Sequence, residues 1–303
     1  MNAPAEILDD PLRVTAEGLL GLRRHLRPPF GGAWHPDQRP AGFPGRRKGA
    51  GLETVDVRVF VEGDDVRHLD RNVSARTGVP HVRRFREERG ATLILIADFR
   101  RPMLWGTRRA TRSVAAAEAL ALGGWRAVEA GGRVGLYAFG GGETRYVAPR
   151  ARISGMAAVA GGLAAAHTDA LRGGTDPALD AALEEAARLA PVGATLLLAS
   201  ALDAPGPDFA RLAGALARYG RLRVALVRDA FETAPPSGGY AYAEDGGAPR
   251  WARVDGPPMP DERMTLLDRL GIAVIPIDVA AGPAAAARAW DRFDGGPSGG
   301  PGR

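Results

Sequence analysis

The sequence predicts an α/β fold, a doubly wound and mostly parallel sheet with helices on both faces, with an appended N-terminal β-rich subdomain. Residues 91–97 form a continuous apolar run without alternation or turn-forming residues, which is typical of a parallel strand covered on both faces. After this run, apolar strands alternate with helical patterns up to residue 293. Residues 55–62 instead alternate apolar and polar side chains, as a half-buried strand does, and the chain around them lacks that strand and helix alternation.

The first 90 residues are expected to hold a helix, a linker and the β-rich subdomain. Residues 11–26 carry leucines among basic residues, as an amphipathic helix does. Residues 30–51 are rich in Gly, Pro and Arg, which predicts a long irregular linker. A second extended segment is expected over residues 81–88, leading into the strand at residues 91–97.

The rest of the chain is expected to supply the α/β domain. Strands are expected over residues 133–139, 143–147, 195–199, 222–227 and 272–279, the first two joined as a hairpin by three glycines at 140–142. Helices are expected over residues 107–129, 154–171, 176–190, 209–219 and 261–270, with a short alanine-rich helix ending at 293. Asp176 before Pro177 reads as an N-cap followed by a first-turn proline. The predicted domains are residues 1–90, 91–293 and a disordered tail at 294–303.

The composition of the chain excludes several classes of protein and of functional site. The chain has 303 residues, 45% of them hydrophobic, so it is long enough to bury a full core. It has no Cys, which excludes a disulfide framework and a thiolate nucleophile. Its first residues lack the basic start and apolar segment of a secretion signal, and no apolar run is long enough to span a bilayer. We therefore expect a soluble, cytoplasmic protein without a membrane span.

The net charge of +5 does not by itself indicate a nucleic-acid partner. Lys48 is the only lysine, and the arginines are spread along the chain among 35 acidic residues. A nucleic-acid footprint is a clustered basic patch with interleaved aromatic side chains. The basic run at residues 83–89 contains Glu87 and Glu88, as a solvated mixed-charge face does. We expect no nucleic-acid partner, and keep a binder led by residues 83–89 as a weaker alternative.

The common enzyme signatures are missing. Lys48 is followed by Gly49 where a phosphate-binding loop needs Ser or Thr, there is no Gly-x-Ser-x-Gly elbow, and the five histidines have no metal-ligand spacing. The most promising position is Asp98, the first charge after the run at 91–97, because functional residues collect beyond the carboxyl ends of strands in α/β sheets. The alternative is that Asp98 only ends the strand and caps the next helix.

Several motifs together resemble the family known as domain of unknown function 58. In the first half they are Gly49-x-Gly51-x-Glu53, Asp56-x-Arg58, Gly63-Asp64-Asp65-x-Arg67-His68-Leu69-Asp70, Ala75-Arg76, and Pro80-x-Val82-Arg83 with Glu87-Glu88-Arg89. The resemblance continues through the loop after Asp98, Gly173-Gly174-Thr175-Asp176 and Asp229-x-x-Glu232-x-x-x-Pro236, and so covers most of the chain.

The resemblance implies a von Willebrand factor A-like fold and a partner, a MoxR-type AAA+ ATPase, with which such proteins act in assembly or activation of other proteins. Domains of this fold bind Mg²⁺ in a metal-ion-dependent adhesion site made of Asp-x-Ser-x-Ser after the first strand, a Thr and a further Asp. Asp98 and Thr175 stand at two of these positions. Arg100 and Pro102 replace the two serines, and Ala201 stands where the further Asp is expected, with Asp203 two residues late.

We therefore expect a non-catalytic adaptor with a degenerate adhesion site, no bound metal and no cofactor. The expected partner-binding residues are Asp98, Arg100, Thr175, Ser200 and Asp203. The family-signature residues Glu53, Arg58, Asp64, Arg67, Asp70, Arg76 and Arg83 are expected to form either an ion-paired joint between the domains, which we favour, or a partner surface.

Two alternatives concern this site. Arg100 either serves as a built-in cation that pairs with Asp98 at rest and with a partner's carboxylate in the complex, or points to solvent without a role. The alternative function is a metal-dependent hydrolase that uses Asp98 and Asp203 in one cleft.

Overall fold

The computed structural model describes residues 10–28, 52–61, 69–87, 91–243, 247–255 and 261–295, with the backbone alone at 52–58, 83–87, 294 and 295. The chain divides into two compact units, one formed by Gln38–Gly90 and the other by Met1–Asp37 with Ala91–Arg303.

The smaller unit is built on a pair of antiparallel strands, β1 (Leu52–Val59) and β2 (His81–Glu87). Helix α2 (Arg71–Thr77), which the sequence patterns did not predict, lies between them in the chain. Asp70 is its N-cap, because its Oδ1 accepts hydrogen bonds from the N–H groups of Asn72 and Val73 at 3.1 and 3.0 Å. The helix ends at Gly78, whose φ of 72° suits a residue without a side chain.

The larger unit is organised around a six-stranded sheet in the order β10-β7-β6-β3-β4-β5. Its strands are β3 (Thr92–Asp98), β4 (Arg133–Phe139), β5 (Arg145–Ala151), β6 (Thr195–Ser200), β7 (Leu222–Arg228) and β10 (Ala273–Asp278). All neighbouring pairs are parallel except β4 and β5, which form the hairpin predicted around the three glycines. The predicted mostly parallel sheet is therefore confirmed.

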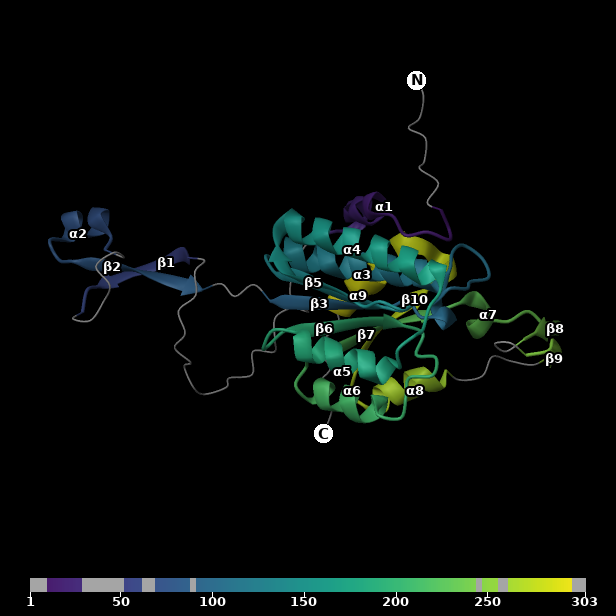
Figure 1. Cartoon of the computed structure of the whole chain (residues 1–303). Coiled ribbons are helices and arrows are strands. Elements are labelled where there is room, and N and C mark those ends of the chain that lie inside the picture. Colours follow the sequence, from purple (N-terminus) through teal and green to yellow (C-terminus); the bar gives the residue numbers. More distant parts are fainter. Residues whose placement is uncertain are drawn as a thin grey trace, which may run out of the picture. The chain divides into compact units, whose positions relative to one another are not determined.

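Helices cover both faces of this sheet (Figure 1). They are α1 (Ala16–Gly21), α3 (Arg112–Glu129), α4 (Arg152–Arg172), α5 (Leu179–Leu189), α6 (Phe209–Arg218), α8 (Glu262–Arg269) and α9 (Gly282–Gly295). The short helix α7 (Ala230–Thr233) follows β7, and the 3-10 turns are η1 (Leu22–His25), η3 (Arg101–Met103) and η4 (Val279–Ala281). Leu93, Leu95 and Ala97 of β3 face the layer of α1, α3, α4 and α9, whereas Ile94 and Ile96 face the layer of α5, α6 and α8. The doubly wound architecture is confirmed and is consistent with a von Willebrand factor A-like fold.

The first helix is shorter than residues 11–26. Thr15 is the N-cap of α1, with its Oγ1 accepting from Gly18 N at 3.1 Å, and the 3-10 turn η1 follows it. The helix packs on α3, where Trp125 Nε1 donates to the carbonyl of Leu19 at 3.3 Å. At the other end, α9 continues through Asp294 to Gly295, past the predicted start of the disordered tail, and residues 296–303 lie outside the described residues.

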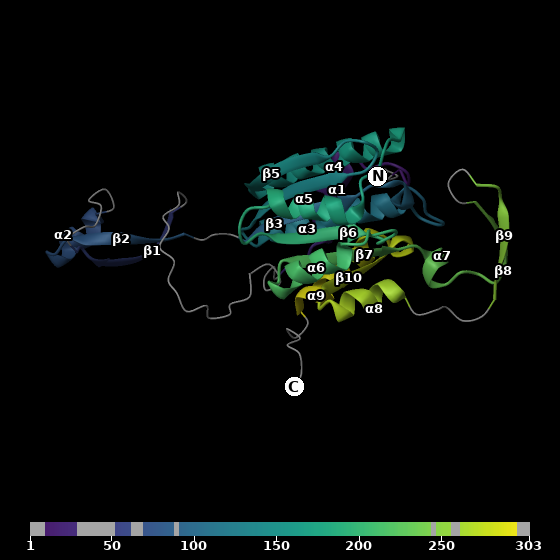
Figure 2. The same cartoon turned by 60° about the horizontal axis from the view of Figure 1, so that its bottom comes forward.

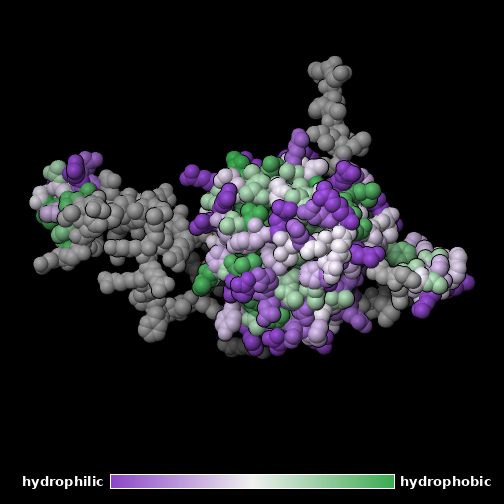
Figure 3. All heavy atoms as spheres, in the orientation of Figure 1, coloured by the Kyte–Doolittle hydropathy of each residue, from purple (hydrophilic) through white to green (hydrophobic). Residues whose placement is uncertain are grey.

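A two-stranded antiparallel ribbon, β8 (Gly238–Tyr242) with β9 (Arg250–Val254), follows α7 in the chain and was not predicted (Figure 2). Its residue Trp251 is 77% exposed. On the face of the molecule shown in Figure 3, hydrophilic and hydrophobic side chains are intermixed. None of the helices in the described part of the chain combines the length and the apolar run that a membrane crossing requires.

Candidate functional site

Two polar side chains meet where neighbouring parallel strands end. Strand β3 ends at Asp98 and β6 at Ser200, and Ser200 Oγ donates a hydrogen bond to Asp98 Oδ2 at 2.6 Å. Both residues are fully buried. Gly140, with φ of 122°, lets the loop after β4 approach the backbone of Phe99 so closely that any side chain would collide. We call the loops at residues 99–111, 140–144, 173–178 and 201–208 the carboxyl edge.

Arg100 turns back onto Asp98 and pairs with it. Its Nε donates to Asp98 Oδ1 and its Nη2 to Asp98 Oδ2, both at 2.9 Å, and its backbone N–H donates to Oδ1 at 3.1 Å. The guanidinium also donates to the carbonyls of Asp203 at 2.9 Å and Ala204 at 3.3 Å, and is buried. Burial alone lowers the pKa of Arg100, but the hydrogen bond and charge of Asp98 outweigh it and raise the pKa above its ordinary value. Arg100 thus pairs with Asp98 and does not point to solvent, and its pairing with a partner's carboxylate stays a prediction.

The side chains at the expected adhesion-site positions do not fit Mg²⁺, which needs several oxygen ligands in an octahedron. Asp98 already accepts four hydrogen bonds, three from Arg100 and one from Ser200. A carboxylate has about four lone-pair sites, so its oxygens have none left for a metal ion. Pro102 brings no side-chain oxygen, and the carboxylate of Asp203 is held by another arginine. Within the described ranges, no group of three or more His, Asp or Glu side chains is placed to hold a metal ion.

Thr175 and Asp176 occupy the neighbouring loop. Thr175 is exposed. The prediction that Asp176 is a helix N-cap is wrong, because α5 begins at Leu179, after Ala178. Asp176 instead accepts hydrogen bonds from Arg101 N at 2.8 Å and Gly141 N at 2.9 Å. A carboxylate that serves two neighbouring loops is not available to its own helix, so Asp176 ties the carboxyl edge together.

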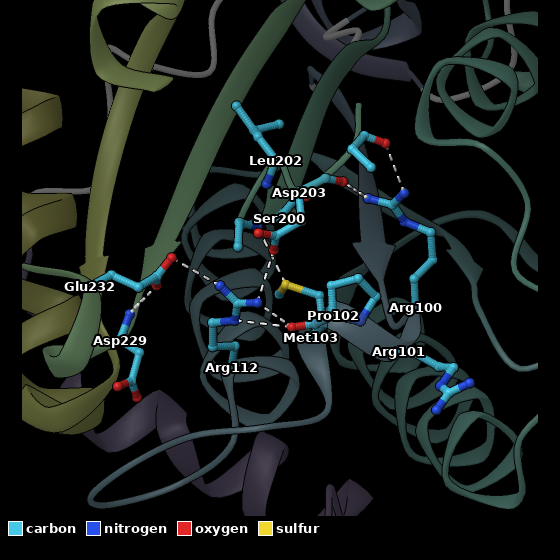
Figure 4. Close-up of polar contacts among 12 residues, drawn as sticks. Arg100, Arg101, Pro102, Met103, Arg112, Ser200, Leu202, Asp203, Asp229 and Glu232 are labelled. Atoms are coloured by element: carbon cyan, nitrogen blue, oxygen red, sulfur yellow. Dashed lines mark hydrogen bonds and ion pairs between the residues drawn. The ribbon is translucent and has the colours of Figure 1, made fainter. Parts of the chain in front are cut away.

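A second charged cluster lies beside the first and is centred on Arg112, at the start of α3 (Figure 4). This fully buried guanidinium donates to Asp203 Oδ2 at 2.8 Å and to Glu232 Oε1 at 3.0 Å. Its Nε donates to the Pro102 carbonyl at 3.1 Å, its Nη2 donates to the same oxygen, and the ring of Trp105 stacks on it at 4.4 Å. Arg112 therefore joins the loop after β3 to the loop after β6 and to α7.

The cluster continues from α7 to α8. Glu232 Oε1 also accepts from Arg263 Nη1 at 2.8 Å, and Arg263 forms a two-pronged pair with Asp261 at 2.8 and 3.0 Å. The hydrogen bonds from Arg263 lower the pKa of Asp261. Asp229, buried after β7, closes a capping box with Glu232 and accepts from Thr107 N at 3.0 Å. The sequence motif contained Asp229 and Glu232, but no pattern singled out Arg112 or Arg263.

Asp203 contributes two different atoms to the site. Its backbone oxygen binds Arg100, and its carboxylate binds Arg112. Burial raises the pKa of Asp203, and the opposing charge of Arg112 does not fully offset this effect. The carboxylates of Asp98 and Asp203, which the hydrolase alternative needs in one cleft, are each held by a different arginine.

A buried histidine lies behind the loop after Asp98. The Nε2 atom of His167 on α4 lies 2.9 Å from Ser113 Oγ, which lies 2.9 Å from Thr111 Oγ1. The ring of Phe99 meets the imidazole edge-on, with 5.2 Å between ring centres. Burial lowers the pKa of His167 to about 4, so the imidazole is neutral near pH 7.

The family-signature residues have local roles where they are described. Asp70 is buried as the N-cap of α2, and Arg76 is exposed in the last turn of that helix. The structure describes only the backbone of Glu53, Arg58 and Arg83, and Asp64 and Arg67 lie outside the described residues. The ion-paired joint between the domains stays a prediction.

Comparison with known proteins identifies a family but no activity. The family model described as "Protein of unknown function DUF58" matches residues 56–256. A solved structure of conserved hypothetical protein BatB from Bacteroides thetaiotaomicron is 14% identical, with a TM-score of 0.43 over 67% of this chain and 98% of that chain. An aerotolerance-related membrane protein from Bacteroides fragilis NCTC 9343, carrying multiple mutations to serines, is 16% identical, with a TM-score of 0.46 over 68% of this chain and 98% of that chain. No curated protein matches the sequence.

Proposed function

Because the chain belongs to the DUF58 family, whose function is unknown, we propose from the chemistry of the carboxyl edge that it is a protein-interaction module without catalysis of its own. The observation that carries the proposal is the pairing of Asp98 with Arg100. In a metal-dependent adhesion site a divalent ion neutralises this carboxylate, and a partner completes the ion's ligands. Here a guanidinium of this chain neutralises it, so the edge is a degenerate adhesion site that is complete without metal.

The hydrogen bonds of the carboxyl edge support a recognition role. Asp98, Arg100, Ser200 and Asp203 are joined by hydrogen bonds, and Thr175 in the neighbouring loop is exposed. These five residues are the proposed partner-binding set, in which Thr175 makes direct contact and the others position the loops. Loops held on a rigid scaffold are typical of binding sites.

The partner we propose is a MoxR-type AAA+ ATPase, acting with this chain in assembly or activation of client proteins in the cytoplasm. This choice rests on the family resemblance. The hydrolase alternative is not favoured by the geometry, since a general base or metal ligand needs free lone pairs and those of Asp98 are used.

Binding of the purified chain to a MoxR-type ATPase tests the proposal. We expect Thr175→Ala to weaken binding about fivefold or more, which corresponds to about 1 kcal/mol, without changing the melting temperature. Tyr219→Ala is the matched control, because Tyr219 is exposed and lies before β7, at the opposite ends of the strands. Equal binding by the parent and Thr175→Ala, or an equal loss in both variants, contradicts the proposed surface.

Titration of the isolated chain with Mg²⁺ and Mn²⁺ tests the metal-free site separately. We expect no heat of binding and no rise in melting temperature. Micromolar binding of either ion by the unmodified chain contradicts the assignment of Arg100 as the cation of this site.

A further inference from the structure

A small cavity of about 110 Å³ lies between η1 with its following residues and α9, and none of its lining residues belongs to the loops of the carboxyl edge. Its lining residues are Arg24, His25, Arg27, Ala284, Ala287, Arg288 and Asp291. The cavity has room for several waters or one small ion. Pockets that take whole small molecules are larger, about 300 Å³ or more.

The hollow follows from the spacing of small residues on α9. Ala284, Ala287, Arg288 and Asp291 fall on one face of the helix, because residues three, four and seven apart share a face. Alanine at 284 and 287 leaves space where a larger side chain would pack against η1. The cavity is therefore bounded by helix surface on one side and by the chain around His25 on the other.

The charge around the cavity is unbalanced. Among the residues that the structure describes, Arg24, Arg27 and Arg288 take part in none of the ion pairs found. The one acidic side chain in the lining, Asp291, already pairs at 2.8 Å with Arg126, which is buried. Three guanidinium groups thus line the same hollow, and the one carboxylate among its lining residues is already paired with Arg126.

We propose that this cavity is an anion site that takes a phosphate group, either as inorganic phosphate or as the phosphate of a small phosphomonoester. Guanidinium groups present paired N–H donors that match the oxygens of a tetrahedral oxyanion. The volume suits the phosphate group itself and leaves any attached organic part outside.

The pKa of His25, which lines the cavity, can be used to detect a bound anion. Its pKa is lowered by burial and by the charge of Arg24. An anion bound in the cavity stabilises the imidazolium, so the pKa of His25 is expected to rise when phosphate is added. The proton resonances of the His25 ring measure this change independently of any heat of binding.

The experiment is calorimetric titration of the full chain with inorganic phosphate, and separately with glycerol 3-phosphate, at low ionic strength. Three variants are compared. Arg288→Ala removes a lining charge and is expected to weaken binding about tenfold, the effect of one charged hydrogen bond. Ala284→Leu fills the cavity while keeping every charge, and is expected to abolish binding. Arg292→Ala removes an exposed cation on the same helix outside the cavity, and is expected to bind as the parent does.

The outcomes separate a built site from general attraction to a basic surface. Tighter binding of glycerol 3-phosphate identifies the phosphate of a larger ligand, and equal or weaker binding identifies free phosphate. The proposal is overturned if neither compound gives heat or moves the pKa of His25 at millimolar concentration. It is also overturned if Ala284→Leu binds like the parent, or if Arg292→Ala weakens binding as much as Arg288→Ala. Unchanged melting temperatures in the three variants establish that they are folded.

Discussion

The arginines of the larger unit have different roles at its two sites, the carboxyl edge and the cavity between η1 and α9. At the carboxyl edge, Arg100 and Arg112 are buried, and each meets carboxylates and carbonyl oxygens of this chain. Around the η1 and α9 cavity, Arg24, Arg27 and Arg288 take part in no ion pair among the described residues, and the one acidic lining residue, Asp291, already pairs with Arg126. The difference teaches that a buried, paired guanidinium builds structure, whereas an unpaired one beside a cavity is available to a ligand.

The strongest test of this contrast is Asp98→Asn. The substitution keeps the shape of the side chain but leaves the buried Arg100 without its counter-charge, so we expect a loss of about 3 to 5 kcal/mol in the free energy of unfolding. Urea denaturation measures it. The control is Asp208→Asn, which removes the acid of the exposed pair with Arg211 and is expected to change stability little. Similar losses in both variants would show that the Asp98 pair is not special.

The buried His167, behind the loop after Asp98, extends the contrast to the pH dependence of stability. His167 has a pKa of about 4 in the folded chain and about 6.5 when unfolded, so the unfolded chain binds more protons between these values. The stability due to neutral His167 is complete above about pH 6.5 and is lost as the pH falls to about 4, by about 3 kcal/mol. His167→Gln should flatten this part of the curve of unfolding free energy against pH. A curve identical to that of the parent contradicts the prediction.

Arg112→Met should cost less than Asp98→Asn. Methionine keeps much of the apolar volume under Trp105, and the carboxylates left behind on Asp203 and Glu232 are partly exposed, so water can solvate them. We expect a loss of about 2 to 3 kcal/mol, because a hub of several charged hydrogen bonds disappears. Thermal unfolding followed by circular dichroism measures the loss. A loss of less than about 1 kcal/mol in the free energy of unfolding would show that Arg112 contributes no more than an arginine in an exposed ion pair.

The smallest change in the free energy of unfolding is expected for a substitution at the cavity between η1 and α9. Arg288→Ala should change the free energy of unfolding by less than about 0.5 kcal/mol in phosphate-free buffer, since the side chain is exposed and makes no ion pair among the described residues. In millimolar phosphate the parent should become more stable than the variant, because a ligand that binds only the folded chain stabilises it. The same stability difference in both buffers would contradict the contrast.

The sheet could be predicted because burial on both faces leaves a plain pattern in the sequence. The run at residues 91–97 gave β3, and the glycines at 140–142 gave the turn between β4 and β5. The first residues of the helices were harder to predict from the sequence. Thr107 falls within a helical pattern, but its N–H and hydroxyl bind Asp229, so residues 107–111 form a loop and α3 begins at Arg112. A bond to a residue this far along the chain leaves no local signal.

The candidate site was predictable in position but only partly in chemistry. The pairing of Arg100 with Asp98 was one of two alternatives, because two residues near in sequence at a strand end can meet. Arg112 and Arg263 were not predicted, since their partners come from other loops and helices. The ribbon of β8 and β9 was also missed, because its short strands rich in Gly, Ala and Arg lack a clear apolar alternation.

The ion pair between Glu232 and Arg263 has a consequence for how this chain tolerates change. It joins α7 to α8 at 2.8 Å, and the ribbon of β8 and β9 lies between these helices in the sequence. Once the two ends of a loop are held together, doubling its length costs only about 0.6 kcal/mol of closure entropy. We therefore expect that lengthening the segment between α7 and α8 changes the stability of the core little, so this segment is a place where the chain can accept an insertion.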